Sequence, residues 1–335
     1  MSGEPAVARR SGTGWKLALR ILVSAVFLAV LINRVPDLHE TIPSRHPLHT
    51  ALLLAAAVLT VLFGIALSAW RWQQVLLVFD APVPMRTLTG HYLAGQFVGN
   101  VLPSTIGGDV LRVTRAAKSV GSTTTAFASV VLERLSGMIA LPLLVVVGFA
   151  LKPSLFHVAH AWVALFVAGV TLAALALILL AAGHPGLGGR FATNDNWTRF
   201  IGAVFQGVDR GRRDPRHMLR VLAIAIIYQL SIVLSYVLIF HALDHSVSPA
   251  GTIAFIPAVS MLQVLPISFN GLGVRESALV LFRHGFGVGS AAAGAAGLLW
   301  YGSLVLVSML GAPLVAIGHR GPRATPAPET SVEPS

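Results

Sequence analysis

Cysteine is absent from the 335 residues of the sequence, and charged residues are scarce. The lack of thiols excludes disulfides, thiolate metal sites and a cysteine nucleophile. Charged residues make up 11% of the chain and hydrophobic residues 55%, whereas soluble domains carry about a quarter charged residues. Several apolar runs approach the roughly 20 residues that cross a bilayer. The composition therefore predicts an all-α polytopic membrane protein.

Acidic residues are the scarcer charged kind, since 13 Asp and Glu stand against 24 Lys and Arg. The resulting net charge of +11 also suits nucleic-acid binding. Here the basic residues cluster in loops beside apolar runs, which is typical of the positive-inside rule and of attraction to anionic headgroups. We therefore expect membrane lipids, with anionic headgroups, as partners, and no nucleic acid. The histidines show no metal-ligand spacing, so we expect neither a metal nor a cofactor.

The apolar runs predict the domain organisation. A basic N-terminal segment (1–16) precedes a helical membrane domain (17–318), and a Pro-rich tail (319–335) is expected to be disordered. We expect about six to eight transmembrane helices. Basic segments, including the loop 183–220, alternate with loops poor in Lys and Arg. This alternation predicts that both termini lie in the cytoplasm. The membrane expected for the protein is a bacterial-type plasma (inner) membrane.

Two segments containing proline and glycine interrupt the apolar pattern: VLPSTIGGDVLR from Val101 and VLPISFNGLGVRE from Val264. Proline removes a backbone donor and glycine can adopt positive φ. Broken backbone at membrane depth is tolerated only where protein buries it or where it lines a watery cavity. Both segments are therefore predicted to be re-entrant. The residues expected to shape their backbones are Pro103, Ser104, Gly107, Gly108, Pro266, Gly271 and Gly273.

The two segments also indicate an internal duplication. Each is followed by Val-Gly-Ser, at 120–122 and at 288–290. We predict one repeat over about 48–151 and a second over about 219–318. Three predicted spans separate the two motifs, and an odd number inverts the second copy. Inverted repeats with broken helices are a transporter architecture.

Six ionisable residues lie in or beside the apolar runs: Asp109, Arg112, Glu133, Arg134, Arg275 and Glu276. Such groups cost several kcal/mol unless paired or hydrated, so each is a candidate functional residue. Glu133 and Arg134 are adjacent and project about 100° apart on a helix. We expect each of them to find a partner on another segment, within one polar cluster that spans both repeats.

Three interpretations of this cluster stay open. It can consist of ion pairs that fix helix packing and bind nothing. Its arginines can hold an anionic group such as a lipid phosphate. Alternatively, Asp109 or Glu133 can carry a proton.

The segment Trp70-Arg71-Trp72 follows the apolar run from Leu48 to Ala69. Aromatic and cationic side chains are enriched at membrane interfaces. These three residues are therefore predicted to anchor the end of that span at the membrane surface.

Several of these motifs together resemble a known family. Trp70-Arg71-Trp72, NVLPSTIGGDVLR at 100–112 and Glu133-Arg134-Leu135-Ser136-Gly137 are similar to the transmembrane, flippase-like region of the lysyl-phosphatidylglycerol synthase family. LPISFNGLGVRE at 265–276 matches the second signature of that family. The resemblance covers roughly residues 15 to 318.

The resemblance implies a helical membrane domain with internal repeats, whose best-understood members move an aminoacylated phospholipid between leaflets. Full synthases carry a soluble aminoacyltransferase domain after the membrane region, whereas about 17 residues follow the last predicted span here. We therefore expect a stand-alone protein without that enzymatic activity. It would bind and translocate, or otherwise handle, an anionic or modified envelope lipid, with Arg112, Arg134 and Arg275 holding the phosphate and the three carboxylates orienting them.

Two alternatives remain at the level of sequence. One is an integral-membrane transferase or hydrolase of phospholipid or polyprenyl-linked substrates, with Asp109 and Glu133 as its paired carboxylates. The other is an accessory subunit of a lipid or polyprenyl-linked glycan pathway, whose enzyme is encoded separately.

Overall fold

The structure is a computed structural model that describes residues 46–101, 107–183, 202, 205–207, 209–211, 214–264 and 271–316. Several predicted features lie outside these residues: the N-terminal segment, the first predicted span, Pro103, Ser104, Pro266 and the C-terminal tail. Regular structure in the described residues is helical throughout. The all-α prediction is therefore confirmed.

The described helices include both long and short elements. Their bounds are α3 (Pro47–Val78), α4 (Met85–Val101), α5 (Gly107–Val120), α6 (Thr123–Leu151), η1 (Pro153–His157), α7 (Ala161–Gly183), α10 (Pro215–Ala242), α11 (Pro249–Gln263), α12 (Val274–Leu281), α13 (Arg283–Phe286), α14 (Ser290–Ser308), η2 (Met309–Gly311) and α15 (Ala312–Ala316).

Within the described residues, five helical stretches are long and apolar enough to cross a membrane. They are α3, α6, α7 up to Ala181, α10, and the continuous stretch from Ser290 to Val315. The hydrocarbon core of a membrane offers no hydrogen-bond partners to the backbone, and an α-helix pairs its backbone N–H and C=O groups internally. The chain is therefore a multi-pass membrane protein, with α11 as an additional, shorter apolar helix.

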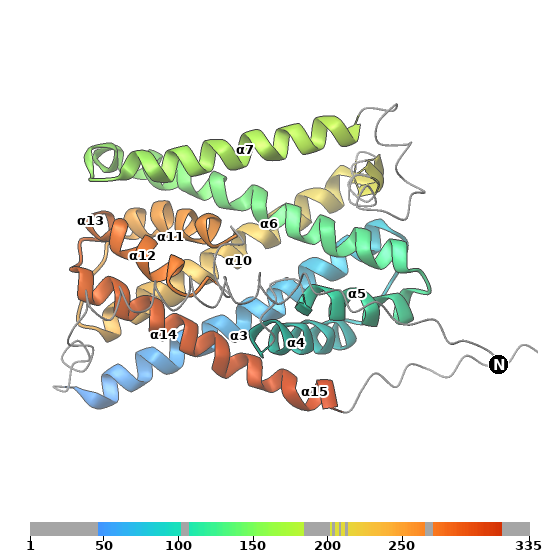
Figure 1. Cartoon of the computed structure of the whole chain (residues 1–335), viewed down its shortest axis with the longest axis horizontal. Helices are drawn as coiled ribbons and strands as arrows, with labels where there is room; N and C mark the ends of the chain where they lie inside the picture. The colour runs from blue at the N-terminus through green and yellow to red at the C-terminus, as the bar shows by residue number, and fades with distance from the viewer. Residues whose placement is uncertain are drawn as a thin grey trace, which may run out of the picture.

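Helices α3 and α10 form the centre of the bundle and run antiparallel (Figure 1). The guanidinium of Arg210, which precedes α10, bonds the carboxylate of Asp80 just after the end of α3, with an N–O distance of 2.9 Å. In the middle of the pair, Gly64 faces the side chains of Tyr228 and Ser231. Asp214 caps α10 by accepting a hydrogen bond from the His217 backbone N–H, and its bonds with His217 lower the pKa of that exposed carboxyl.

The short helices form two groups that lie toward opposite ends of the molecule, α4 and α5 at one end and α11 to α13 at the other (Figure 1). Each group follows a long helix and precedes another, since α3 and α6 flank the first group and α10 and α14 the second. A duplication of the chain, direct or inverted, would give this order of elements in both halves. The duplication itself stays a prediction.

Glycines shape the two groups in different ways. Gly107 and Gly108 were expected to shape the backbone as residues able to take positive φ. Among the described glycines, Gly271 and Gly273 have positive φ, whereas Gly108 lies within α5. Instead, Gly108 is helical and allows α5 to approach α4, because an added Cβ would lie 2.4 Å from the carbonyl oxygen of Gly95. Close backbone approach, rather than a left-handed turn, explains this glycine.

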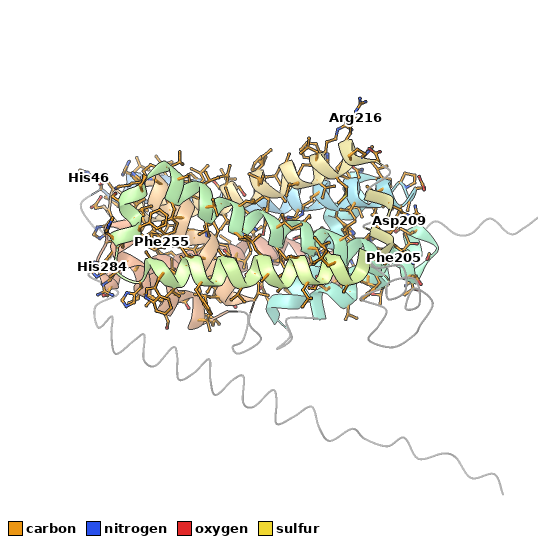
Figure 2. All side chains as sticks on the ribbon, turned by 90° about the horizontal axis from the view of Figure 1, so that it is seen from above. His46, Phe205, Asp209, Arg216, Phe255 and His284 are labelled. Atoms are coloured by element: carbon orange, nitrogen blue, oxygen red, sulfur yellow. The ribbon has the colours of Figure 1, made fainter. Side chains whose placement is uncertain are left out.

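An extended apolar core lies around the second group. Phe255 of α11 packs between the rings of Phe149, Phe282 and Phe286, with ring centroids 5.0 to 6.0 Å apart. Figure 2 places Phe255 at the same end of the molecule as His46 and His284, opposite Arg216. This aromatic core holds α6, α11, α12 and α13 together, and thereby positions Arg275 at the beginning of α12.

Candidate functional site

Glu133 is the centre of a buried ion-pair network on α6. One carboxylate oxygen bonds the guanidinium of Arg71 on α3, and the other lies 3.2 Å from the Arg112 guanidinium on α5. All three side chains are buried. Gly137 lies one turn beyond Glu133 and leaves room for Arg71. A Cβ added to Gly137 would lie 3.1 Å from the Nη1 atom of Arg71. Three helices are thus joined through one carboxylate.

Asp109 extends this network toward the more exposed Arg134. Its Oδ1 atom lies 2.7 Å from Arg134 Nη2 and 3.4 Å from Arg112 Nη1. The Arg134 side chain is 58% exposed, whereas that of Arg112 is 3% exposed. Glu133 and Arg134 therefore do find partners on other helices, as their adjacency in sequence predicted.

Arg112 is clamped between two aromatic rings. Its guanidinium carbon lies 4.4 Å from the ring centroid of Trp72 on α3 and 4.3 Å from that of Tyr92 on α4. The indole N–H of Trp72 donates to Ser129 Oγ on α6 at 3.0 Å, which fixes the ring. Cation–π contacts of this kind stabilise a buried guanidinium and restrict its orientation.

Arg275, in the second half of the chain, has a similar environment. Its guanidinium carbon lies 4.9 Å from the Trp300 ring and 5.1 Å from the Tyr301 ring, both on α14. The indole N–H of Trp300 donates to Ser235 Oγ on α10 at 2.9 Å. In both halves, therefore, an arginine near the start of a short helix packs against aromatic rings, and a serine hydroxyl fixes the Trp ring.

Glu276 and Gln263 complete this second arginine environment. Arg275 Nε donates to Gln263 Oε1 on α11 at 3.0 Å, and its Nη1 atom lies 3.6 Å from Glu276 Oε1. The other Glu276 oxygen accepts a hydrogen bond from the backbone N–H of Gly273 at 2.6 Å. Glu276 thus caps α12 and partly balances Arg275, and the positive φ of Gly273 brings its N–H into reach.

A cavity of about 350 Å³ separates the two arginine environments. Arg112, Arg134 and Arg275 line it together with Asp109, whereas Glu133 lies behind Arg112, outside the lining. The six predicted residues therefore form two charged groups on a shared cavity rather than one continuous cluster of ion pairs. The uncharged polar side chains of the lining are those of Thr60, Ser68, Tyr92, Gln96, Asn100, Tyr228, Ser231, Ser235, Ser260 and Gln263.

The predicted interfacial anchor at Trp70, Arg71 and Trp72 needs a correction. Helix α3 continues to Val78, and while Trp70 is 43% exposed, Arg71 and Trp72 are buried at 4% and 0% exposure. The apolar run from Val75 to Phe79, which follows Gln73 and Gln74, is the sequence signal that could have indicated a longer helix. Arg71 and Trp72 instead belong to the polar interior, where they contact Glu133 and Arg112.

Sequence reasoning also missed the aromatic clamps and the polar lining. Tyr92, Trp300 and Tyr301 lie in apolar stretches where an aromatic residue gives no sign of its partner. Within the described residues, no group of three or more His, Asp or Glu side chains is placed to hold a metal ion. The chemistry that the described cavity offers is therefore ion pairing, hydrogen bonding and cation–π contact.

Comparison with known proteins gave one family. A family model described as the lysylphosphatidylglycerol synthase TM region matches residues 17–311. A search of the curated proteins found no match.

Proposed function

The chain belongs to the family of the lysylphosphatidylglycerol synthase TM region, and from this membership and the geometry of the cavity we propose that it binds an anionic or modified envelope lipid and moves it between leaflets. The observation that carries the proposal is the cavity lined by Arg112 and Arg275, each packed against two aromatic rings. Guanidinium groups bind phosphate oxygens through charge-assisted, often bidentate hydrogen bonds.

The arginines are held in place before any ligand arrives. Arg112 is fixed by Trp72, Tyr92 and Glu133, and Arg275 by Gln263 and the α14 rings. A preorganised site loses less conformational entropy on binding. Fixed arginines on both sides of one cavity therefore suit a charged headgroup that has to leave water.

A path for the headgroup follows from the exposure of the arginines. Arg134 is the most exposed of the three that line the cavity, and it shares Asp109 with the buried Arg112. In our proposal a phosphate first meets Arg134, then takes the place of the Asp109 carboxylate beside Arg112, and is passed on toward Arg275. Each exchange replaces one anion by another, so no guanidinium is left uncompensated in a medium of low dielectric constant. The acyl chains stay in lipid.

The alternative of a transferase or hydrolase receives less support from the geometry. Asp109 contacts the guanidiniums of Arg112 and Arg134, and Glu133, which lies outside the lining, contacts those of Arg71 and Arg112. A general acid or base has to reach a substrate proton. Carboxylates that are engaged with arginines in this way suit charge balance better than proton transfer. We therefore propose no enzymatic activity for this chain.

We further propose a bacterial-type plasma membrane location with both termini in the cytoplasm. Arg210, Arg216 and Arg220 lie in or beside the first turns of α10, near the end of α3. His46 and His284 lie at the opposite end of the molecule (Figure 2). The end rich in arginine is expected to face the cytoplasm.

The proposal is tested by leaflet-resolved translocation of headgroup-labelled anionic lipids in proteoliposomes. We expect Arg112→Ala and Arg275→Ala each to slow translocation about 10- to 100-fold, because one charge-assisted contact contributes about 1.5–3 kcal/mol. Arg216→Ala removes an exposed arginine at the end of the molecule and serves as the matched control.

Unfolding of each variant in detergent separates a functional defect from loss of fold. Arg112→Lys keeps the charge but lacks the bidentate geometry, and we expect partial activity from it. Folded Arg112→Ala and Arg275→Ala proteins with wild-type rates would contradict the proposal. The proposal would also be contradicted if the folded wild-type protein moved none of the anionic lipids.

A further inference from the structure

Histidines gather at the end of the molecule that lies opposite Arg216. Figure 2 places His46 and His284 at this end, and α3 and α7 begin there while α6 and α10 end there (Figure 1). Seven of the nine histidines in the described residues lie in these terminal segments. We call the seven the histidine face: His46, His49, His157, His160, His241, His245 and His284.

The histidine face lies at the level of the membrane surface. His46 is the N-cap of α3, and His241 lies in the last turn of α10, so both mark the ends of helices that cross the membrane. Trp162, in the first turn of α7, is 67% exposed. Exposed tryptophan is typical of the headgroup region of a bilayer. The groups within reach of these imidazoles are therefore the lipid headgroups of one leaflet.

The imidazoles are accessible and free of acidic partners. All are exposed except that of His245, which is half-buried. Within the described part of the chain, no carboxylate forms an ion pair with any of the seven, whereas His217 at the opposite end lies 2.6 Å from Asp214. The His241 ring bonds the Val237 carbonyl through Nδ1 at 2.8 Å, which leaves Nε2 to take up a proton. A proton bound on this face therefore adds a charge that no ion pair cancels.

Few permanent charges surround the histidine face. Lys152 follows α6, Asp244 follows α10 and Arg283 begins α13, which leaves one net positive charge. In the sequence, the segment 33–45 before α3 adds two arginines and two acidic residues, whose charges balance. Histidine is the side chain whose charge ordinarily changes between about pH 5 and 8. Protonation of all seven imidazoles raises the net charge of the described part of this face from one to eight.

From this arrangement we infer that the histidine face is a pH-dependent surface, which gathers anionic lipid headgroups from the surrounding leaflet when the medium on its side is acidic. Cationic side chains at a membrane surface attract anionic lipids in this way. The inference goes beyond the proposed function, because none of the seven histidines lines the cavity. The positive-inside bias depends on Lys and Arg, so histidines add a conditional charge without opposing the proposed orientation.

The experiment measures which lipids lie beside each end of the full-length chain. The protein is reconstituted in phosphatidylcholine nanodiscs, which expose both ends to the same buffer. A fluorophore is attached to Ser154→Cys, an exposed position of η1 on the histidine face, or to Thr124→Cys, an exposed position in the first turn of α6 at the opposite end. Quenching by nitroxide-labelled phosphatidylglycerol, relative to equally labelled phosphatidylcholine, reports enrichment of the anionic lipid near the fluorophore.

We expect the quenching ratio at Ser154→Cys to rise about 2- to 5-fold between about pH 7.5 and about pH 5.5, because protonated imidazoles attract phosphatidylglycerol. High salt should abolish the rise, since it screens exposed charges. The ratio at Thr124→Cys should change little, because Lys and Arg stay charged at both pH values. It serves as the matched control within the same protein.

Two variants test the histidines directly. A variant with glutamine at all seven positions should lose the rise, and its folding is checked by thermal unfolding. A triple variant with His46→Gln, His157→Gln and His284→Gln changes only exposed side chains on three elements, and it should show a smaller rise.

Three results would overturn the inference. One is a quenching ratio at Ser154→Cys that does not depend on pH in the wild-type background. Another is an undiminished rise in the folded glutamine variants, which would assign the effect to other groups. The last is an equal rise at Thr124→Cys, which would show that the effect does not belong to this face.

Discussion

At the residue scale, Glu133 shows why a charged group is kept inside an apolar bundle. It is 1% exposed and compensates two buried guanidiniums that come from helices on either side. Each arginine has further contacts, since Arg71 lies over the Tyr228 ring and Arg112 over the rings of Trp72 and Tyr92. The network thus fixes the position of α5 relative to α3 and α6, and with it the position of Arg112 at the cavity.

We predict that Glu133→Gln lowers the free energy of unfolding by about 3–5 kcal/mol, because it leaves Arg71 and Arg112 without their shared buried anion. The measurement is thermal or denaturant-induced unfolding in detergent. The matched acid-to-amide control is Asp80→Asn, in the exposed pair with Arg210. Exposed pairs contribute about 1 kcal/mol or less. Similar losses in the two variants would argue against a structural role for the buried network.

At the element scale, the pair of helices α4 and α5 depends on close backbone contact. An added Cβ at Gly95 would lie 2.7 Å from Arg112 Cγ and 2.9 Å from the carbonyl oxygen of Gly108. On the other side of α4, an added Cβ at Gly311 would lie 2.1 Å from the carbonyl oxygen of Leu93. Helix α4 is therefore packed tightly between α5 and the end of the α14 stretch, and the Arg112 side chain lies in the contact.

We predict that Gly108→Ala destabilises the protein by about 1–3 kcal/mol, the usual range for overpacking. The physical reason is that the new methyl group would lie 2.4 Å from backbone, which cannot rotate away. Lipid translocation should fall as well, because separating α5 from α4 moves Arg112 relative to the Tyr92 ring. Unfolding and proteoliposome assays on the same preparation measure both effects.

Gly90→Ala is the matched control on the same pair of helices. Gly90 lies in α4, and an added Cβ there would meet nothing within 4 Å. Since alanine favours helix over glycine by up to about 1 kcal/mol, this variant should be as stable as the natural chain or more so. Destabilisation by Gly90→Ala equal to that by Gly108→Ala would contradict the packing explanation.

At the scale of the whole molecule, the bundle has two chemically different ends. Helices α3 and α10 run antiparallel, so the end of α3 and the beginning of α10 meet at the end marked by Arg216 (Figure 2). The opposite end carries His46 and His284. The two groups of short helices lie toward these opposite ends (Figure 1). In the proposed function, the cavity between them exchanges a headgroup between the two membrane surfaces.

The orientation can be measured with single cysteines, because the natural chain has none. We predict that a membrane-impermeant maleimide labels His284→Cys in intact spheroplasts and labels Arg216→Cys only after permeabilisation. Both positions are exposed, so access to the thiol depends on the side of the membrane. The reverse pattern would invert the proposed orientation. If both positions are labelled in intact spheroplasts, the two ends of the bundle do not lie on opposite sides of the membrane, and the prediction is wrong.

The sequence by itself determined the class of the protein and the positions of its unusual residues. Hydropathy is a local property, so runs such as Thr123–Leu151 identify membrane helices without any knowledge of their neighbours. A charge within such a run is unusual whatever it contacts, which is why Glu133 and Arg134 could be singled out. Their adjacency also predicted separate partners, since neighbours on a helix face different directions.

Tertiary structure alone decided which partners these residues have. Arg71 and Glu133 are 62 positions apart, and Arg112 and Glu133 are 21 apart. Such contacts depend on how helices rotate and cross, which hydropathy does not encode. For the same reason Arg71 and Trp72 were predicted at the membrane surface but lie in the interior. The six charged residues were expected in one cluster, and they form two groups of which Asp109, Arg112, Arg134 and Arg275 line one cavity. The groups are separate because Arg112 and Arg275 lie on different short helices, α5 and α12, and each has its own carboxylate partner.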